Sequence, residues 1–508
     1  MSDPKPVRPE LAAVLEAQHA ALDEARPDAV AKQHARGGWT IRESIGAFLD
    51  PGSFVEYGRL ARPARPDMTG PADGLVMGTG MVDGGPVCVM GYDYSVHAGT
   101  QSAINHAKAS RIFELARARR WPVVCWAEGG GARPHDSVAM QRTSGFVPHT
   151  FISFAQMSGL VPRIVVAPGR AFAGQANLSG LSDILIATKR TAMGMAGPPL
   201  VEAALGVKYA PEEIGPVEVH VAAGAVDILV EDDAAAAAMA RQCLGYFRGP
   251  AAPGPEPDVE RLRAVIPENP RRAYDVRKVI EGLADVGSVV ELRPKFGRAM
   301  VTAFARIEGR PVGILANQPM FLAGAIDSPA SDKAARFISL CDAFDIPMLI
   351  LCDTPGLMVG PEIETTALVR HSARILMALA NATVPILTVV LRKAYGLGYY
   401  ILGSPPLRPT VLLAWPTAEF GGMGIEGAVN IIYRKELEAE PDSDRRAAMH
   451  REFTEQLKIA HTALAQAGRY ALDDVIDPAD TRLILAQVLR TCPPPPPRTE
   501  RKHWVDAW

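Results

Sequence analysis

Apolar and polar residues follow two patterns along the chain. Unbroken apolar runs at residues 121–126 and 346–352 have the length of buried strands, and each follows a helical stretch that begins near Ser102 or Ser328. Both runs lead into an acidic residue and a glycine-containing turn. Short strands that alternate with helices predict an α/β fold in each half of the chain.

The N-terminal region carries a different pattern. Across residues 9–35, apolar side chains lie near helical spacing among Glu, Gln and Asp, which predicts one amphipathic helix. A Gly-Gly-Trp break follows it. Thr40 and Glu43 then have the spacing of a capping box, so a short helix is expected to run from there through Phe48.

The two halves of the chain repeat each other. Gly131 and Gly356 lie 225 positions apart, and other identical residues fall at the same offset. These include the pairs Pro86 and Pro311, Gly99 and Gly324, Lys108 and Lys333, Arg111 and Arg336, and Pro122 and Pro347. A duplication that keeps a glycine turn in both copies predicts two similar sites that act on two parts of one reaction.

Length and linker composition predict two domains. The chain has 508 residues, which exceeds the roughly 250–300 residues that one hydrophobic core usually serves. Residues 249–258 are rich in proline and glycine and form the clearest boundary. The predicted parts are an N-terminal helix (1–35), a first domain (36–250), a linker with a connecting helix (251–290), a second domain (291–491) and a proline-rich tail (492–508).

Composition excludes several classes of protein. A net charge of −3 provides no polycation, so no nucleic-acid partner is expected. The six cysteines form no Cys-x-x-Cys pair, which predicts buried thiols and no metal site. No apolar segment reaches the roughly 20 residues of a membrane span, and no signal peptide is visible. We therefore expect a soluble, cytoplasmic protein without a membrane partner.

Four turns are candidates for the chemistry. Residues 129–131 and 354–356 follow strands, and residues 173–177 and 392–400 follow strands later in the two repeats. Glycines in such turns can aim backbone N–H groups at an oxygen anion. They can equally be tight turns that only tolerate left-handed backbone or close helix packing, and the residues alone leave both readings open.

Taken together, the motifs resemble the carboxyltransferase (beta) subunit of biotin-dependent acyl-CoA carboxylases, as in propionyl- and methylcrotonyl-CoA carboxylases. The resemblance covers roughly residues 30–490. It rests on segments 130–133, 158–162 and 173–174 in the first half, and on 331–337, 341–347, 353–356, 382–385, 392–396 and 414–418 in the second.

The resemblance implies a duplicated crotonase-type (ClpP-like) spiral fold and an active site shared between two subunits. The first domain would hold acyl-CoA and the second biotin, in a dimer or a hexamer. N–H groups of Gly130 and Gly131 would stabilise the thioester enolate, and those of Leu397 and Gly398 the biotin oxygen. The other implied contacts are Arg133, Ala173, Gly174, Gln175 and Tyr400 for the substrate, and Tyr395 and Gly396 for biotin.

Three departures from the family pattern bear on substrate and partners. Leu397 and Tyr400 replace a glycine and an aspartate, and Tyr400 is expected to set acyl-group size. Residues 134–136, Pro-His-Asp, replace Ile-Gln-Glu, and His135 is interpreted as a pocket-wall or surface residue. No lysine lies between two methionines, so biotin and its carboxylase are expected on a partner polypeptide.

Three alternative functions remain open from the sequence. The same turns could serve a biotin-dependent decarboxylase or transcarboxylase. A hydratase or isomerase without biotin would need paired carboxylates beside the first turn, where Glu128 is the nearest acid. The third alternative is a non-catalytic, CoA-binding scaffold, which the altered residues 397–400 would favour.

Overall fold

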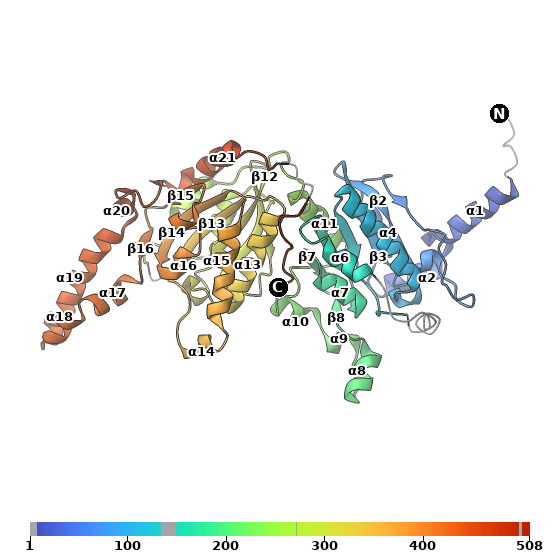
Figure 1. Cartoon of the computed structure of the whole chain (residues 1–508), viewed down its shortest axis with the longest axis horizontal. Coiled ribbons are helices and arrows are strands. Elements are labelled where there is room, and N and C mark those ends of the chain that lie inside the picture. The colour runs from blue at the N-terminus through green and yellow to red at the C-terminus, as the bar shows by residue number, and fades with distance from the viewer. Residues whose placement is uncertain (1–7, 134–148, 271, 497–499) are drawn as a thin grey trace. The chain divides into compact units, whose positions relative to one another are not determined.

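The computed structural model describes residues 8–133, 149–270, 272–496 and 500–508. The chain divides into two compact units (Figure 1). The first comprises Met1–Leu244 with Glu500–Ala507, and the second comprises Gly245–Thr499 with Trp508. Part of the predicted tail thus belongs to the first unit, where the Val505 N–H donates to Ser158 Oγ at 2.9 Å.

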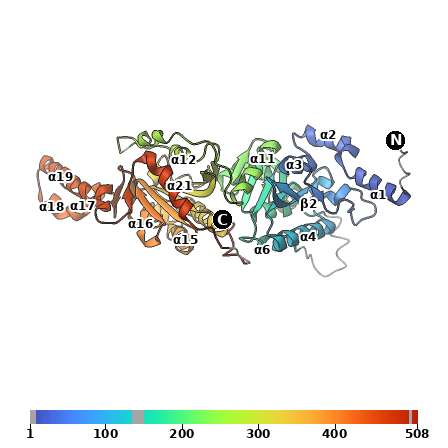
Figure 2. The same cartoon turned by 90° about the horizontal axis from the view of Figure 1, so that it is seen from above.

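The first unit is built on a mixed sheet. Its described strands run in the order β1-β2-β3-β4-β5-β7-β9, antiparallel from β1 to β3 and parallel from β3 onward. Their bounds are β1 Val55–Glu56, β2 Leu75–Val82, β3 Gly85–Tyr92, β4 Val123–Trp126, β5 Arg163–Ala167, β7 Ile184–Thr188 and β9 Ile228–Val230. Figure 2 shows α4 (Ala103–Arg119) and α6 (Thr150–Gln156) on one face, and α3 (Ile41–Phe48) and α11 (Asp233–Tyr246) on the other.

The second unit repeats this sheet. Its described order is β10-β11-β12-β13-β14-β15-β17, again antiparallel for the first three strands and then parallel. The bounds are β10 Val290–Leu292, β11 Met300–Ile307, β12 Arg310–Asn317, β13 Met348–Thr354, β14 Ile386–Tyr395, β15 Val411–Ala414 and β17 Asp474–Val475. Helices α12 (Arg277–Leu283) and α21 (Thr481–Thr491) cover one face, and α13 (Ser328–Ala343) and α15 (Leu368–Asn381) cover the other (Figure 2).

Shorter elements complete both units. In the first unit they are β6 Arg170–Phe172, α7 Gly174–Gly180, β8 Ala192–Gly194, α8 Pro198–Leu205, α9 Pro211–Ile214 and α10 Val217–Ala222. In the second they are α14 Pro361–Glu364, α16 Gly396–Tyr400, β16 Glu419–Gly421, α17 Ile425–Ile432, α18 Arg434–Ala439, α19 Ser443–His461 and α20 Ala463–Ala467. Among the described helices, none combines the length and apolar character that a membrane crossing needs.

The duplication predicted at an offset of 225 is confirmed in the backbone. Leu75 pairs with Tyr92 in β2–β3, and Met300 pairs with Asn317 in β11–β12, which are the positions 225 residues further on. Unusual positive φ angles recur at the same offset. They are 49° at Asp83 and Glu308, 51° and 53° at Ala98 and Ala323, and 58° and 59° at Arg120 and Asp345. Two α/β units with one pattern are the duplicated fold expected from the sequence.

Two buried lysines also correspond. Lys108 Nζ donates to three main-chain carbonyls, those of Gly58, Ala72 and Leu75. Lys333 Nζ does the same in the second unit, to the carbonyls of Arg293, Phe296 and Met300. Each ammonium group donates its three protons to backbone oxygens. Both lysines therefore stabilise the fold and are not available as bases.

The predicted helix starts follow from capping side chains. Ser102 caps α4 by accepting from the Asn105 N–H at 3.0 Å, and Asp327 caps α13. At α3 the capping box is complete, since the Glu43 N–H donates to Thr40 Oγ1 at 3.1 Å and the Thr40 N–H donates to Glu43 Oε2 at 2.7 Å. These starts, predicted near Ser102, Ser328 and Thr40, are confirmed.

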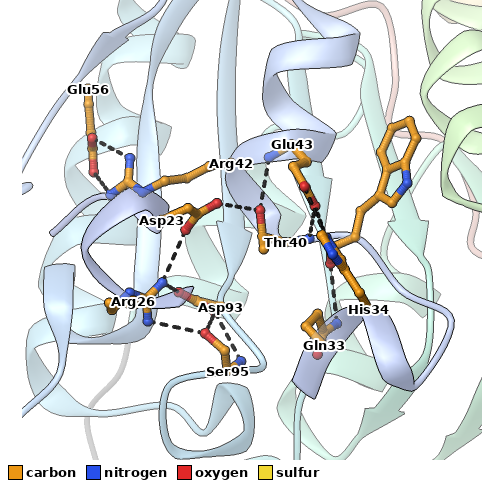
Figure 3. A network of polar contacts seen from close by, with 11 residues as sticks. Asp23, Arg26, Gln33, His34, Thr40, Arg42, Glu43, Glu56, Asp93 and Ser95 are labelled. Carbon is orange, nitrogen blue, oxygen red and sulfur yellow. Dashed lines mark hydrogen bonds and ion pairs between the residues drawn. The ribbon is translucent and has the colours of Figure 1, made fainter. Parts of the chain in front are cut away.

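The single N-terminal helix predicted over residues 9–35 is wrong. Two helices replace it, α1 (Pro9–Ala20) and α2 (Pro27–Ala35), with a 3₁₀ turn between them. Pro27 begins α2 because proline lacks an N–H and fits only the first turn of a helix. The turn is held by Arg26, whose guanidinium donates to Asp23 at 3.2 Å and to Asp93 at 3.0 Å (Figure 3).

Candidate active site

The first glycine turn (residues 129–131) follows β4. Gly131 has a φ of +85°, and a side chain on Gly129 would come within 2.3 Å of the Gly99 carbonyl. Glycine is therefore required at both positions, by backbone conformation at one and by close approach at the other.

Both N–H groups predicted as donors in this turn have partners inside the chain. The Gly130 N–H donates to the Ala98 carbonyl at 3.2 Å, and the Gly131 N–H donates to Gln175 Oε1 at 2.9 Å. A donor that is already bonded has to break that bond before it can bind an oxyanion. The catalytic role predicted for Gly130 and Gly131 stays a prediction, which these bonds do not favour.

Gln175 ties the turn to its neighbours. Its side chain is fully buried, and its Nε2 donates to the Gly99 carbonyl at 2.7 Å while Oε1 accepts from Gly131. The substrate contact predicted for Gln175 stays a prediction, and the bonds of its buried amide to the backbone favour a contact through its main chain.

The first donor segment (residues 173–175) follows β6 and opens α7. Ala173 has a φ of 52°, which turns the chain so that the N–H groups of Gly174 and Gln175 lie at the free start of the helix. Within the described parts of the chain, these two N–H groups have no protein acceptor. A side chain on Gly174 would come within 2.0 Å of Gln101 Oε1, so a larger residue there requires the Gln101 side chain to move.

The second donor segment (residues 396–398) has the same geometry. Gly396 has a φ of 54°, close to the 52° of Ala173, and it opens α16. The positive φ falls on Gly396, and Leu397 lies within the helix, so leucine there is unstrained. In the described structure, the N–H groups of Leu397 and Gly398 also lack a protein acceptor.

The duplication pairs the two donor segments with each other. Matching Ala173 to Gly396 places Gly174 opposite Leu397 and Gln175 opposite Gly398. The second glycine turn (residues 354–356) packs against its segment, since a side chain on Gly398 would lie 2.6 Å from Gly356 Cα. Each half thus presents two adjacent backbone donors, supported by a glycine turn.

A buried ion pair between Asp353 and Arg392 holds the second donor segment in place. Arg392 Nε donates to Asp353 Oδ2 at 3.0 Å, and the Lys393 N–H donates to Asp353 Oδ1 at 3.1 Å. Both side chains of the Asp353–Arg392 pair are buried. Burial lowers the pKa of Lys393, and its Nζ donates to the Ala323 carbonyl at 2.7 Å. Since Asp353 precedes the glycine turn and Arg392 precedes the donor segment, the pair locks the two together.

Residues around the second donor segment differ in how far their side chains are exposed to solvent. Tyr395 is buried, and its hydroxyl donates to Glu419 Oε2 at 2.8 Å, while burial raises its pKa. Leu397 and Tyr400 are 54% and 43% exposed. Tyr400 is therefore free to contact a ligand, whereas the phenol of Tyr395 serves to hold β14 against β16.

Arg133 is a structural residue in the described contacts. It is 3% exposed, and its guanidinium donates to Asp73 Oδ1 at 2.7 Å and to the Thr100 carbonyl at 3.3 Å. The substrate contact predicted for its side chain stays a prediction that these bonds do not favour. The neighbouring residues Pro134, His135 and Asp136 lie outside the described residues.

Residues 32–493 match the carboxyl transferase domain family. The chain belongs to that family. It is 37% identical to the methylmalonyl-CoA carboxyltransferase 12S subunit of Propionibacterium freudenreichii over 91% of this chain and 90% of that protein. It is 36% identical to the propionyl-CoA carboxylase beta chain of Saccharopolyspora erythraea, with 94% and 92% covered.

Solved carboxyltransferase structures share the fold. A transcarboxylase 12S structure superposes with a TM-score of 0.87 at 34% identity, covering 99% of this chain and all of the other. A single-chain, multi-domain long-chain acyl-CoA carboxylase gives a TM-score of 0.89 at 43% identity over 95% of this chain. This chain spans about half, 49%, of that enzyme. The carboxyltransferase resemblance and the duplicated fold are confirmed.

Sequence reasoning did not predict the partners of several residues that shape this carboxyltransferase site. In the first half, Gln101 lies against Gly174 and the Gly99 carbonyl accepts from Gln175. In the second half, Arg392 pairs with Asp353 before the second donor segment, and no sequence motif indicates any of these partners. One signal was present in the repeat itself. Both glycine turns follow a buried acid, Glu128 or Asp353, at positions 225 residues apart.

Proposed function

We propose that the chain is the carboxyltransferase subunit of a biotin-dependent acyl-CoA carboxylase. It moves a carboxyl group from N1′ of carboxybiotin to the α-carbon of an acyl-CoA. One observation carries the proposal: two equivalent pairs of backbone donors, at Gly174–Gln175 and at Leu397–Gly398, that have no protein acceptor among the described residues and are each supported by a glycine turn.

The reaction needs two such pairs because two oxygens gain charge. The thioester carbonyl becomes an enolate oxygen, and the ureido oxygen of biotin becomes negative as carbon dioxide leaves. Each is stabilised by preorganised N–H donors, and losing one donor typically raises the barrier by about 3–4 kcal/mol. A duplicated fold supplies both sets with the same geometry.

We assign the pairs by their places in the two halves. Gly174 and Gln175 serve the thioester, in place of the Gly130 and Gly131 pair expected from the sequence. Leu397 and Gly398 serve the biotin oxygen, as expected. Gly130 and Gly131 shape the first site through their bonds to Ala98 and Gln175.

No side-chain base enters this scheme. The ureido nitrogen that decarboxylation releases takes the α-proton of the acyl group. Candidate bases nearby are already engaged, since Lys393 Nζ bonds the Ala323 carbonyl and Asp353 holds Arg392. The protein orients two substrates and stabilises two charges.

The proposed partners follow from the same scheme. Biotin arrives on a carrier polypeptide together with a biotin carboxylase, because the chain has no lysine flanked by methionines. The 12S relative is described as a hexamer, and we propose a dimer with shared sites or a hexamer here. A cytoplasmic location stays a prediction. Purification of the native complex should recover a biotinylated partner, and its absence would exclude the scheme.

One relative favours a second candidate. The relative from Propionibacterium freudenreichii is named the methylmalonyl-CoA carboxyltransferase 12S subunit, and a solved 12S structure is described as a transcarboxylase. The same donor pairs would serve that reaction in either direction. Dependence of acyl-CoA carboxylation on ATP and bicarbonate distinguishes a carboxylase from a transcarboxylase. The non-catalytic scaffold loses part of its support, because Leu397 lies within α16 without a positive φ.

Tyr400→Asp is expected to change acyl-group preference while carboxybiotin-dependent turnover is retained. Tyr400 is 43% exposed, two residues beyond Gly398, so its ring can form a pocket wall. A few methylenes of pocket volume change discrimination by about 1–3 kcal/mol, roughly 10–200-fold in relative kcat/KM. Rates on a panel of acyl-CoAs should shift toward short unbranched ones. An equal fall for every substrate would show that Tyr400 acts on biotin or on folding.

A further inference from the structure

A buried carboxyl group lies directly before the first glycine turn. Glu128 is only 8% exposed. Within the described residues, its carboxyl makes no hydrogen bond and no ion pair, although buried acids are normally bonded or paired. The proposed mechanism gives it no role, so its presence beside the first donor segment needs another explanation.

The acid at the equivalent position in the second half of the chain has an ion-pair partner, which Glu128 lacks among the described residues. Asp353 occupies the equivalent position and is paired with Arg392 at 3.0 Å. The match of Ala173 to Gly396 places Gly169 where the second half has Arg392. A side chain on Gly169 would come within 2.0 Å of Glu128 Oε1. The longer acid thus fills, in the first half, the space that an arginine fills in the second.

Nearby cations do not replace that arginine. Arg190 Nη2 donates to both oxygens of Asp233 at 3.0 Å, and Asp233 also accepts from the Trp39 N–H at 2.6 Å. The charged groups that act on Glu128 are Arg190, Asp233, Asp93 and Arg36. Two of them are acids, and the two cations, Arg190 and Arg36, form no hydrogen bond or ion pair with the Glu128 carboxyl in the described structure.

The surroundings suit a neutral acid. Glu128 lines a small cavity of about 10 Å³ together with Gln33, Thr40 and Tyr92. Gln33 Oε1 is buried there with no partner among the described residues. Gln33 and Thr40 come from the N-terminal network that Figure 3 shows, in which Gln33 Nε2 donates to the Trp39 carbonyl at 3.2 Å.

We propose that Glu128 is a positioning residue of the acyl-CoA site and that it performs this role as the neutral acid. Its uncharged carboxyl fills the space beside Gly169 and keeps the first glycine turn against the chain that leads into the first donor segment. The inference rests on the proposed function, since it concerns the donors assigned to the thioester.

Backbone hydrogen bonds connect the position of Glu128 to the N–H donors of Gly174 and Gln175. The Gly129 N–H donates to the Arg170 carbonyl at 2.6 Å, and the Phe172 N–H donates to the Gly129 carbonyl at 3.0 Å. Ala173 and Gly174 follow directly. A displacement of Glu128 therefore moves the strand that positions the thioester donors.

Burial raises the pKa of Glu128 to about 7, with Asp233 adding to the rise and Arg190 opposing it. The ordinary value in an unfolded chain is about 4.3. Between these values the folded chain binds the proton more tightly, so stability falls as the pH rises from about 4.3 to about 7 and then levels off. Acyl-CoA turnover should decline as Glu128 ionises above about pH 7.

Glu128→Gln tests this because the amide copies the neutral acid in shape. At about pH 8.5 the variant should turn over acyl-CoA at least severalfold faster than the wild-type protein, and near pH 6 the two should agree. Its thermal midpoint should exceed that of the wild type at the higher pH only. Glu231→Gln, a change at an exposed acid of the same unit, is the surface control and should follow the wild type throughout.

A double-mutant cycle tests the contact itself. Gly169→Ala inserts a carbon 2.0 Å from Glu128 Oε1 and should lower acyl-CoA turnover at least about tenfold. In a Glu128→Ser background the clash is absent, so the same change should cost less than about threefold. Circular dichroism identifies any variant that misfolds.

Identical pH profiles of turnover and midpoint for wild type and Glu128→Gln would overturn the inference, as would equal costs of Gly169→Ala in both backgrounds. The midpoint comparison needs no activity. If no acyl-CoA is carboxylated by any variant, the proposed function fails, and the midpoints still decide the state of Glu128.

Discussion

Leu397→Pro is expected to lower acyl-CoA carboxylation about 10²–10³-fold without unfolding the protein. The substitution removes one backbone donor from the pair assigned to the biotin oxygen. Leu397 lies in the first turn of α16, where its N–H serves no helical bond, and proline is tolerated at such positions. Steady-state rates with carboxybiotin give the activity, and thermal midpoints report the fold.

Leu397→Ala is the matched control for this variant. Alanine removes the leucine side chain, which is 54% exposed, but keeps the backbone N–H of residue 397. It should retain turnover within about threefold. Equal losses in the proline and alanine variants would show that the leucine side chain matters, and the backbone donor would then be excluded.

Asp353→Ala is expected to destabilise the second unit by about 3–5 kcal/mol, because it leaves the Arg392 guanidinium buried without its carboxylate. The same change frees the Lys393 N–H that Asp353 accepts at 3.1 Å. Denaturant unfolding of wild type and variant gives the difference in the free energy of unfolding.

Two further variants decide whether this loss comes from the buried charge. Asp353→Asn keeps the shape and one acceptor oxygen, so its loss should be smaller than that of alanine. Glu438→Ala breaks a mostly exposed pair with Arg434 and should leave the unfolding curve unchanged. If alanine at 353 proves as harmless as alanine at 438, the ion pair does not lock the second site.

Local signals in the sequence predicted much of the fold. Capping residues Ser102 and Thr40 fix where helices begin, since each bonds backbone within three residues. The repeat at 225 residues predicted two like sheets, because identical positions at one offset require the same backbone. The single N-terminal helix was wrong because Pro27, which lacks an N–H, fits only the first turn of a helix and therefore begins a second one, α2.

The candidate site was predicted less completely, for a physical reason. A glycine turn shows which N–H groups could donate hydrogen bonds. Whether those N–H groups already have acceptors depends on residues far away in the sequence. The Gly130 and Gly131 donors are taken by Ala98 and by the Gln175 side chain. The partner of Asp353 is likewise 39 positions away, at Arg392. No local pattern encodes such pairings.

The central claim is that this chain transfers carboxyl groups from biotin to acyl-CoA. In the most direct measurement, the purified native complex is given ATP, labelled bicarbonate and a panel of acyl-CoAs. The incorporation of the bicarbonate label into each acyl-CoA is then followed. We expect incorporation that avidin abolishes and that Leu397→Pro reduces about 10²–10³-fold. Incorporation that persists with avidin, or conversion of acyl-CoA by hydration or isomerisation without biotin, would contradict it.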